Sequence, residues 1–203
     1  MSTFNYLALG DSYTIGEGVA QRESFPFLLQ EKLACNDIVL STPTIVAQTG
    51  WTTAELIQAI EKREPLNTTF DLVTLLIGVN NQYRGLSLAE FEREIVFLVY
   101  KAIAFAGGNH AHVLILSIPD YGYTPFGFAE QERIENEINL FNSVLQEVVQ
   151  DLDIEYVDVT EASRQYSQQA GYLTADQLHP SAKLYQVWVE HLYPRVEKLL
   201  CGL

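Results

Sequence analysis

Basic residues are scarce in this chain. It has 12 lysines and arginines against 26 aspartates and glutamates, which gives a formal net charge of −14 at pH 7. A field of this sign repels nucleic acids and anionic membrane surfaces, and it favours neutral or cationic ligands. The composition therefore argues against a nucleic-acid partner.

Cysteine is rare as well. Both cysteines, Cys35 and Cys201, lie in or beside apolar segments, and neither has metal-ligand spacing. We expect both to be reduced, buried and without a chemical role. The histidines and carboxylates show no metal-ligand spacing either, so we expect no metal and no other cofactor.

Long hydrophobic runs are missing. No apolar run reaches the roughly 18 residues that a membrane-spanning helix needs. The N-terminus has no basic stretch followed by an apolar core and a cleavage site. We expect no stable membrane insertion and a cytoplasmic location, although a chain whose leader has been removed would look the same. The sequence does not indicate an oligomeric state.

What is present is the composition of a folded domain. The chain has 203 residues, of which 48% are hydrophobic and 19% are charged. This length suits one α/β domain with a substantial core. Because there is no internal repeat, low-complexity tract or flexible linker, we predict one domain over residues 1–203.

Apolar runs predict five strands, at residues 4–9, 44–47, 71–77, 112–118 and 154–159. Helical spacing of apolar residues predicts helices at 25–35, at 52–63, from 88 to Gly107, around 134–148 and around 184–196. Capping-box patterns at Thr52/Glu55 and Ser87/Glu90 mark two helix starts. Pro194 should kink or stop the last helix, and residues 160–180 are expected to be irregular. Alternating strands and helices imply an α/β fold with a parallel sheet covered on both faces.

The first strand leads into Gly10-Asp11-Ser12, a tight turn that carries a hydroxyl. Gly10 can adopt backbone angles that a β-carbon forbids, and we expect Asp11 to bind backbone amides of the turn. A serine on such a turn stands clear of the sheet edge, where a nucleophile can reach a substrate. A phosphate-binding turn or a plain β-to-α connection would have the same outline.

Two more polar positions, Gly50 and Asn80, come just after the next two strands. Ligands of open α/β sheets bind at the carboxyl ends of strands, where the strand order reverses. We therefore expect Ser12, Gly50 and Asn80 to share one crevice. Their backbone and amide N–H groups could bind a developing oxyanion.

A serine nucleophile needs a base, and the base needs a group that holds its tautomer. Near the C-terminus stands Asp176-Gln177-Leu178-His179. Asp176 can reach one ring nitrogen of His179 across three residues, and the other nitrogen would face Ser12 if this loop folds over the strand ends.

These four motifs, in this order, resemble those of the SGNH hydrolase (GDSL-type esterase/lipase) superfamily. They are Gly10-Asp11-Ser12, Gly50, Asn80 in Gly78-Val79-Asn80-Asn81, and Asp176 with His179, and together they extend over the whole chain. The resemblance implies a flavodoxin-like three-layer α/β/α sandwich with a five-stranded parallel sheet. It also implies a Ser12–His179–Asp176 triad and an oxyanion hole formed by Ser12, Gly50 and Asn80.

The chain departs from the family pattern at two positions. Tyr13 stands where leucine is frequent, and Asn81 stands where an acid is usual. Asn81 keeps the size and hydrogen-bonding capacity of the acid without its charge, so we expect altered loop anchoring or substrate contacts there.

Residues that flank the motifs are candidates for the substrate pocket. They are Tyr13, Trp51, Asn81, Tyr83, Arg84, Tyr121, Tyr123 and Phe126. The aromatic loop from Tyr121 to Phe128 could hold an acyl, aryl or sugar group, or it could cover the edge of the core. Arg84 could meet an anionic group of the substrate or form a surface ion pair.

The predicted function is hydrolysis of small or medium carboxylic esters through an acyl-enzyme. Carbohydrate O-deacetylation and cleavage of thioesters or lysophospholipids would use the same mechanism. A flavodoxin-like flavin-binding module and an inactive binding module are alternatives from other classes. An α/β-hydrolase is disfavoured because Ser12 does not lie in Gly-x-Ser-x-Gly.

Overall fold

A computed structural model describes residues 3–63 and 68–201. Its main sheet has five parallel strands in the order β4-β2-β5-β6-β7. Numbered along the chain within this sheet, the order is 2-1-3-4-5, the flavodoxin-like arrangement. The strands are β2 (Tyr6–Gly10), β4 (Thr44–Ala47), β5 (Leu72–Leu76), β6 (Val113–Leu116) and β7 (Glu155–Val157). The predicted fold class is therefore confirmed.

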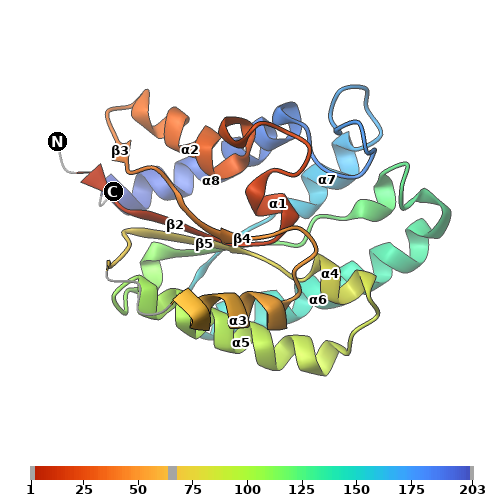
Figure 1. Cartoon of the computed structure of the whole chain (residues 1–203), viewed down its shortest axis with the longest axis horizontal. Helices are drawn as coiled ribbons and strands as arrows, with labels where there is room; N and C mark the ends of the chain where they lie inside the picture. The colour runs from red at the N-terminus through yellow and green to blue at the C-terminus, as the bar shows by residue number, and fades with distance from the viewer. Residues whose placement is uncertain (1–2, 64–67, 202–203) are drawn as a thin grey trace.

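Helices cover both faces of this sheet (Figure 1). On one face lie α2 (Phe25–Ala34) and α8 (Ala182–Cys201), and on the other lie α3 (Thr53–Arg63), α5 (Leu88–Phe105) and α6 (Gln131–Asp151). Shorter helices are α1 (Ser12–Ile15), α4 (Val79–Tyr83) and α7 (Thr160–Tyr166), with 3-10 turns η1 (Gln21–Glu23), η2 (His110–His112), η3 (Tyr121–Tyr123) and η4 (Phe128–Glu130). In the part of the chain described, no helix is long and apolar enough to cross a membrane.

The central strands are almost wholly apolar because both faces are covered. All five residues of β2 and all five of β5 are buried. The one polar residue of β5, Thr74, has its hydroxyl 3.0 Å from the hydroxyl of Tyr6 on β2. This pairing satisfies both groups in a region that water cannot reach.

The first predicted strand, residues 4–9, is two strands in the structure. Thr3–Phe4 (β1) pairs with Val39–Leu40 (β3) in a separate two-stranded parallel sheet. Asn5 breaks the run, and its backbone N–H donates to the Asp71 carboxylate at 2.7 Å. The apolar pattern is continuous across this break, so periodicity alone does not reveal it.

Two helix predictions need correction, and a third offered two alternatives. Residues 160–180 are not wholly irregular, because Thr160–Tyr166 forms α7. Ser87 does precede α5, but its side chain makes no capping hydrogen bond. Of the two effects expected of Pro194, a kink or a stop, the stop is not observed, because α8 continues to Cys201.

The cysteine prediction is also wrong in one respect. Cys35 and Cys201 are both free thiols, but both are exposed to solvent. Cys35 caps the C-terminal end of α2, and Cys201 is the last residue of α8, so each lies where a helix leaves the core. An apolar neighbourhood in sequence did not make them buried.

Candidate active site

The turn after β2 fixes the predicted nucleophile, Ser12. Asp11 caps α1 by accepting a hydrogen bond from the Tyr13 N–H at 3.0 Å, as expected of a structural acid. At Gly10, a β-carbon would lie 2.1 Å from the Thr14 hydroxyl oxygen and 2.3 Å from the Leu76 carbonyl. The turn can therefore be this tight only with glycine, and it places Ser12 as the first residue of α1.

A second turn holds the predicted base. The Asp176 Oδ1 atom accepts three hydrogen bonds, from the Thr174 hydroxyl at 2.7 Å and from the N–H groups of Leu178 and His179 at 2.9 and 3.0 Å. Gln177 adopts a left-handed conformation, with φ of 60°, which a non-glycine residue holds only when its surroundings enforce it. The turn is thus fixed around the Asp176 carboxylate.

The two turns meet across the rim of the sheet. His179 Nδ1 lies 2.7 Å from Asp176 Oδ2, and His179 Nε2 lies 3.0 Å from Ser12 Oγ. An ionised carboxylate can only accept, so Nδ1 carries the ring proton and Nε2 is left to accept the serine hydroxyl. The three side chains form one continuous chain of hydrogen bonds.

The charge state of Asp176 supports this arrangement. Partial burial alone would raise its pKa, but hydrogen bonds from His179, Thr174 and two backbone N–H groups hold the pKa well below its ordinary value. The carboxylate therefore stays ionised at neutral pH and favours the tautomer with the proton on Nδ1.

Asp11 has the opposite environment. It is 1% exposed, and burial raises its pKa to about 7, although the hydrogen bond from Tyr13 opposes the shift. Its second carboxylate oxygen has no hydrogen-bond partner among the residues that the structure describes. Asp11 thus supports the turn, but its burial disfavours the ionised form of its carboxyl group.

Gly50 and Asn80 lie beside Ser12 in the wall of one cavity. Gly50 follows β4 with φ of +81°, and Asn80 lies in α4 just after β5. The Asn80 side-chain amide donates one hydrogen bond to the Trp51 carbonyl at 2.9 Å. An amide nitrogen carries two donors, so the second can serve the cavity while the first fixes the Gly50-Trp51 loop.

Arg84 supports the same loop from outside. Its guanidinium donates to the Gly50 carbonyl and lies 3.3 Å from the Glu55 carboxylate. Glu55 in turn accepts from the N–H of Thr52 at 2.8 Å, which confirms the capping box that starts α3. Of the two readings of Arg84, the ion pair is the one observed. No feature of the sequence predicted the hydrogen bond from Arg84 to the Gly50 carbonyl.

The cavity above Ser12 and His179 has a volume of about 200 Å³. Four of the predicted pocket residues line it, and three unpredicted ones join them. The predicted ones are Tyr13, Tyr83, Tyr121 and Phe126, and the others are Thr49, Val79 and Leu178. Each of these three residues directly precedes a motif residue, and this adjacency is the feature of the sequence that could have identified them. The wall is largely apolar and carries no acidic or basic residue other than His179.

Asn81 points away from this cavity. It is 1% exposed, accepts from the Thr53 N–H at 3.0 Å and donates to the Thr53 hydroxyl at 2.6 Å. Of the two effects expected there, loop anchoring is observed and a place in the pocket is not. Neighbouring residues of a helix do not face the same way, so Asn80 and Asn81 have different surroundings.

Trp51, Arg84 and Tyr123 also lie outside the cavity. Trp51 borders a separate surface hollow over α3, and the Tyr123 hydroxyl donates to the Glu135 carboxylate at 3.0 Å on the outer side of the loop. Adjacency to a motif in sequence was therefore an incomplete guide to the pocket.

Known proteins give an independent comparison. The model of the GDSL-like lipase/acylhydrolase family matches residues 8–187. No curated protein matches the chain.

Solved structures with the same fold include TesA, which is 21% identical with a TM-score of 0.77, over 96% of this chain and 99% of that one. An acetyl xylan esterase from Geobacillus stearothermophilus is 16% identical with a TM-score of 0.74, over 95% of this chain and 94% of that one. A phospholipase A1 from Streptomyces albidoflavus is 20% identical with a TM-score of 0.70, over 97% and 99%. At such identities the likeness shows a shared fold.

The family match extends over most of the chain, from within β2 to within α8, and so includes all four motifs. It favours a hydrolase over a flavin-binding module. The chain therefore belongs to the GDSL-like lipase/acylhydrolase family, a family of ester-hydrolysing enzymes.

Proposed function

We propose that this protein is a serine esterase that cleaves small or medium carboxylic esters through an acyl-enzyme, with Ser12, His179 and Asp176 as its triad. The observation that carries the proposal is the pair of contacts made by His179, 3.0 Å to Ser12 and 2.7 Å to Asp176. This is the distance range in which a base takes a proton from a nucleophile.

In the first half of the reaction, Ser12 Oγ attacks the ester carbonyl carbon while His179 Nε2 takes the hydroxyl proton. The tetrahedral intermediate collapses, the bond to the alcohol oxygen breaks, and the imidazolium of His179 gives its proton to the leaving alcohol. Asp176 remains ionised and stabilises the charged imidazolium.

In the second half, water takes the place of the alcohol. His179 removes a proton from it, the resulting hydroxide adds to the acyl carbon, and the Ser12 oxygen leaves and recovers its proton from His179. The acid is released and the enzyme returns to its starting state. Every proton is carried by one imidazole, so the cycle needs no metal.

The oxyanion of both intermediates is assigned to the N–H groups of Ser12 and Gly50 and to the Asn80 amide. Gly50 and Asn80 are held by Arg84 and by the Trp51 carbonyl respectively. Donors fixed in advance need no reorganisation as charge develops. Each such donor is typically worth about 3 kcal/mol in the transition state.

The cavity supports a substrate of modest size. Its volume of about 200 Å³ is below the range of about 300 to 1,000 Å³ that is common for sites of drug-sized ligands. The largely apolar wall, with the rings of Tyr13, Tyr83, Tyr121 and Phe126, suits a short acyl chain or an aryl group.

A panel of p-nitrophenyl esters from acetate to dodecanoate tests the proposal. We expect the highest kcat/KM at acetate to hexanoate, and we expect Ser12→Ala to reduce kcat by about 10⁶-fold. A strict preference for acetate would favour carbohydrate O-deacetylation instead. A Ser12→Ala enzyme as active as the natural one would overturn the mechanism.

A further inference from the structure

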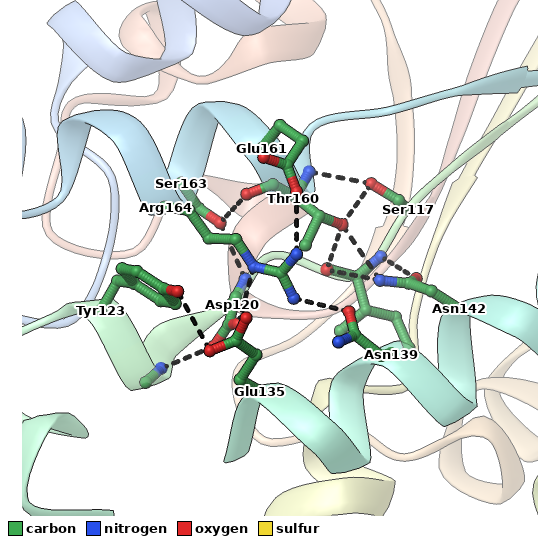
Figure 2. A network of polar contacts seen from close by, with 12 residues as sticks. Ser117, Asp120, Tyr123, Glu135, Asn139, Asn142, Thr160, Glu161, Ser163 and Arg164 are labelled. Atoms are coloured by element: carbon green, nitrogen blue, oxygen red, sulfur yellow. Dashed lines mark hydrogen bonds and ion pairs between the residues drawn. The ribbon is translucent and has the colours of Figure 1, made fainter. Parts of the chain in front are cut away.

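A buried ion pair lies directly behind the aromatic wall of the cavity. In the loop after β6, the Asp120 side chain is fully buried, and its Oδ2 atom lies 3.0 Å from Nε of Arg164 on α7. Its Oδ1 atom accepts from the Gly122 N–H at 2.9 Å, and its own N–H donates to the Ser163 hydroxyl at 2.8 Å (Figure 2). Asp120 thus ties the loop to α7 through two contacts and makes a third within the loop.

Arg164 extends these contacts to two helices. It donates to the Asn139 side chain on α6 at 2.6 Å and to Glu161 on α7 at 2.8 Å. Its guanidinium also lies over the Tyr123 ring, 5.9 Å from the centroid. As Figure 2 shows, the Arg164 guanidinium contacts side chains of the loop, of α6 and of α7.

A second set of polar groups fixes the start of the same loop. The Thr160 hydroxyl donates to Ser117 at 2.7 Å, and Asn142 accepts from the Ile118 N–H at 2.8 Å and donates to Thr160 at 3.0 Å. Buried polar networks whose members are paired are rigid and allow one arrangement. The loop from Ser117 to Tyr123 therefore has little freedom.

This rigidity matters because Tyr121 lies in the middle of the loop and lines the cavity. Its ring centroid lies 6.0 Å from that of Tyr83 and 6.3 Å from that of Phe126, two other rings of the wall. Tyr83 and Phe126 are 59% and 52% exposed, whereas Tyr121 is 4% exposed and is the anchored member. A buried ion pair contributes little to net stability compared with apolar packing, so fold stability alone does not account for it.

We propose that the Asp120–Arg164 pair is a positioning device that holds Tyr121 against the cavity and so sets how well acyl groups larger than acetyl are accepted relative to acetyl. The inference rests on the proposed esterase function. Arg164 does not itself touch the substrate, and it affects substrate preference by fixing the position of Tyr121.

The test compares kcat/KM for p-nitrophenyl hexanoate and acetate in Arg164→Gln, Arg164→Lys and a control, Arg195→Gln. Arg195 forms a comparable Arg–Glu pair, with Glu155, that is exposed and does not line the cavity. We expect Arg164→Gln to lower kcat/KM for hexanoate by about tenfold, mainly through KM, because a misplaced contact penalises a positioned substrate. Acetate hydrolysis and the rate of Ser12 labelling by a fluorophosphonate should stay within about twofold. Arg164→Lys should keep part of the hexanoate-to-acetate ratio of kcat/KM that Arg164→Gln loses. The control, Arg195→Gln, should keep the ratio of the natural enzyme.

A double-mutant cycle with Tyr121→Ala separates positioning from general stabilisation. If Arg164 acts through Tyr121, Arg164→Gln will not change the hexanoate-to-acetate ratio further in the Tyr121→Ala enzyme. Additive effects, or an unchanged ratio in folded Arg164→Gln protein, would overturn the inference while leaving the esterase proposal intact. Should Arg164→Gln not fold, Ser163→Ala is expected to shift the ratio in the same direction, and an unchanged ratio there would also overturn the inference. A natural enzyme that neither hydrolyses esters nor labels would instead defeat the proposed function.

Discussion

At the scale of single residues, Asp11 is unusual because it is buried beside the nucleophile, and one of its oxygens has no partner within residues 3–63 and 68–201. Burial raises its pKa to about 7 from an ordinary value of 3.8. Between these two pH values the folded protein binds a proton that the unfolded chain has released. The contribution of Asp11 to the unfolding free energy is therefore fully present below the pKa of this group in the unfolded chain. It is lost as the pH rises through about 7.

We predict that Asp11→Asn removes this loss, because asparagine caps a helix equally well and stays neutral. Relative to the natural protein, the variant should gain up to about 4 kcal/mol in unfolding free energy between pH 4 and pH 7.5. Urea denaturation of both proteins across this range measures the difference, in which the contributions of other titrating groups cancel. Parallel stability curves would show that Asp11 is ionised at no cost.

The hydrogen bonds of Asn81 show how an asparagine fits this position, where the family pattern has an acid. The Thr53 hydroxyl accepts from Asn81 at 2.6 Å and donates its one proton to Glu94. An aspartate at position 81 would have no donor and would compete with Glu94 for that proton.

We therefore predict that Asn81→Asp lowers the unfolding free energy by about 1 to 3 kcal/mol, the effect of an unsatisfied buried polar group. Adding Glu94→Gln should recover most of the loss, because glutamine supplies the donor that Asn81 provided. Thermal or urea denaturation of the single and double variants checks this. A double variant no more stable than Asn81→Asp would show that a donor at position 94 cannot replace the donor lost at position 81.

At the scale of secondary-structure elements, two strand-to-helix turns depend on glycine to different degrees. Gly78 has φ of +124°, and a β-carbon there would lie 2.7 Å from both Phe91 and Ile118. Gly50 has φ of +81°, and its nearest neighbour would be the Arg84 guanidinium at 3.6 Å. Gly50 therefore needs glycine for its backbone angle alone, whereas Gly78 also needs it for space.

Accordingly, Gly50→Ala should cost about 1 to 2 kcal/mol, the strain of a left-handed alanine. Gly78→Ala should cost at least about 1 to 3 kcal/mol more through overpacking. Urea denaturation midpoints of the two variants give the comparison. Equal losses would mean that the side chains around Gly78 can move aside.

The elements also show where sequence reasoning succeeds. Buried parallel strands are continuous apolar runs, and the covering helices carry apolar stripes, so the main strands and long helices were predictable. Helix α7 was not, because its sequence is mostly polar. Its start is stabilised by the Asp158 carboxylate, which accepts from the Thr160 N–H at 2.8 Å.

The site was predictable to the extent that strand ends determine position. Topology brings the ends of β2, β4 and β5 to one edge, so Ser12, Gly50 and Asn80 were expected together and do line one cavity. Side-chain direction was less accessible, as Trp51, Asn81, Arg84 and Tyr123 show. The single-domain prediction and the assigned roles of the site residues remain predictions.

At the scale of the whole molecule, the charge of −14 should affect which esters reach the site. Anionic substrates are repelled on approach, whereas neutral ones are not. We predict that p-nitrophenyl acetate is hydrolysed with a higher kcat/KM than mono-p-nitrophenyl succinate, and that the ratio falls several-fold when the salt is raised from about 0.02 to about 0.5 M. The neutral ester serves as its own control, since its rate should hardly change. A ratio independent of salt would mean that discrimination comes from contacts in the cavity.

The proposed esterase function depends on activation of Ser12 as a nucleophile by His179 and Asp176. Labelling of the folded protein with a fluorophosphonate, followed by peptide mapping, tests this claim most directly. We expect one adduct, on the peptide that contains Ser12, formed far more slowly in His179→Ala. An adduct on any other peptide, or none from folded protein, would contradict it.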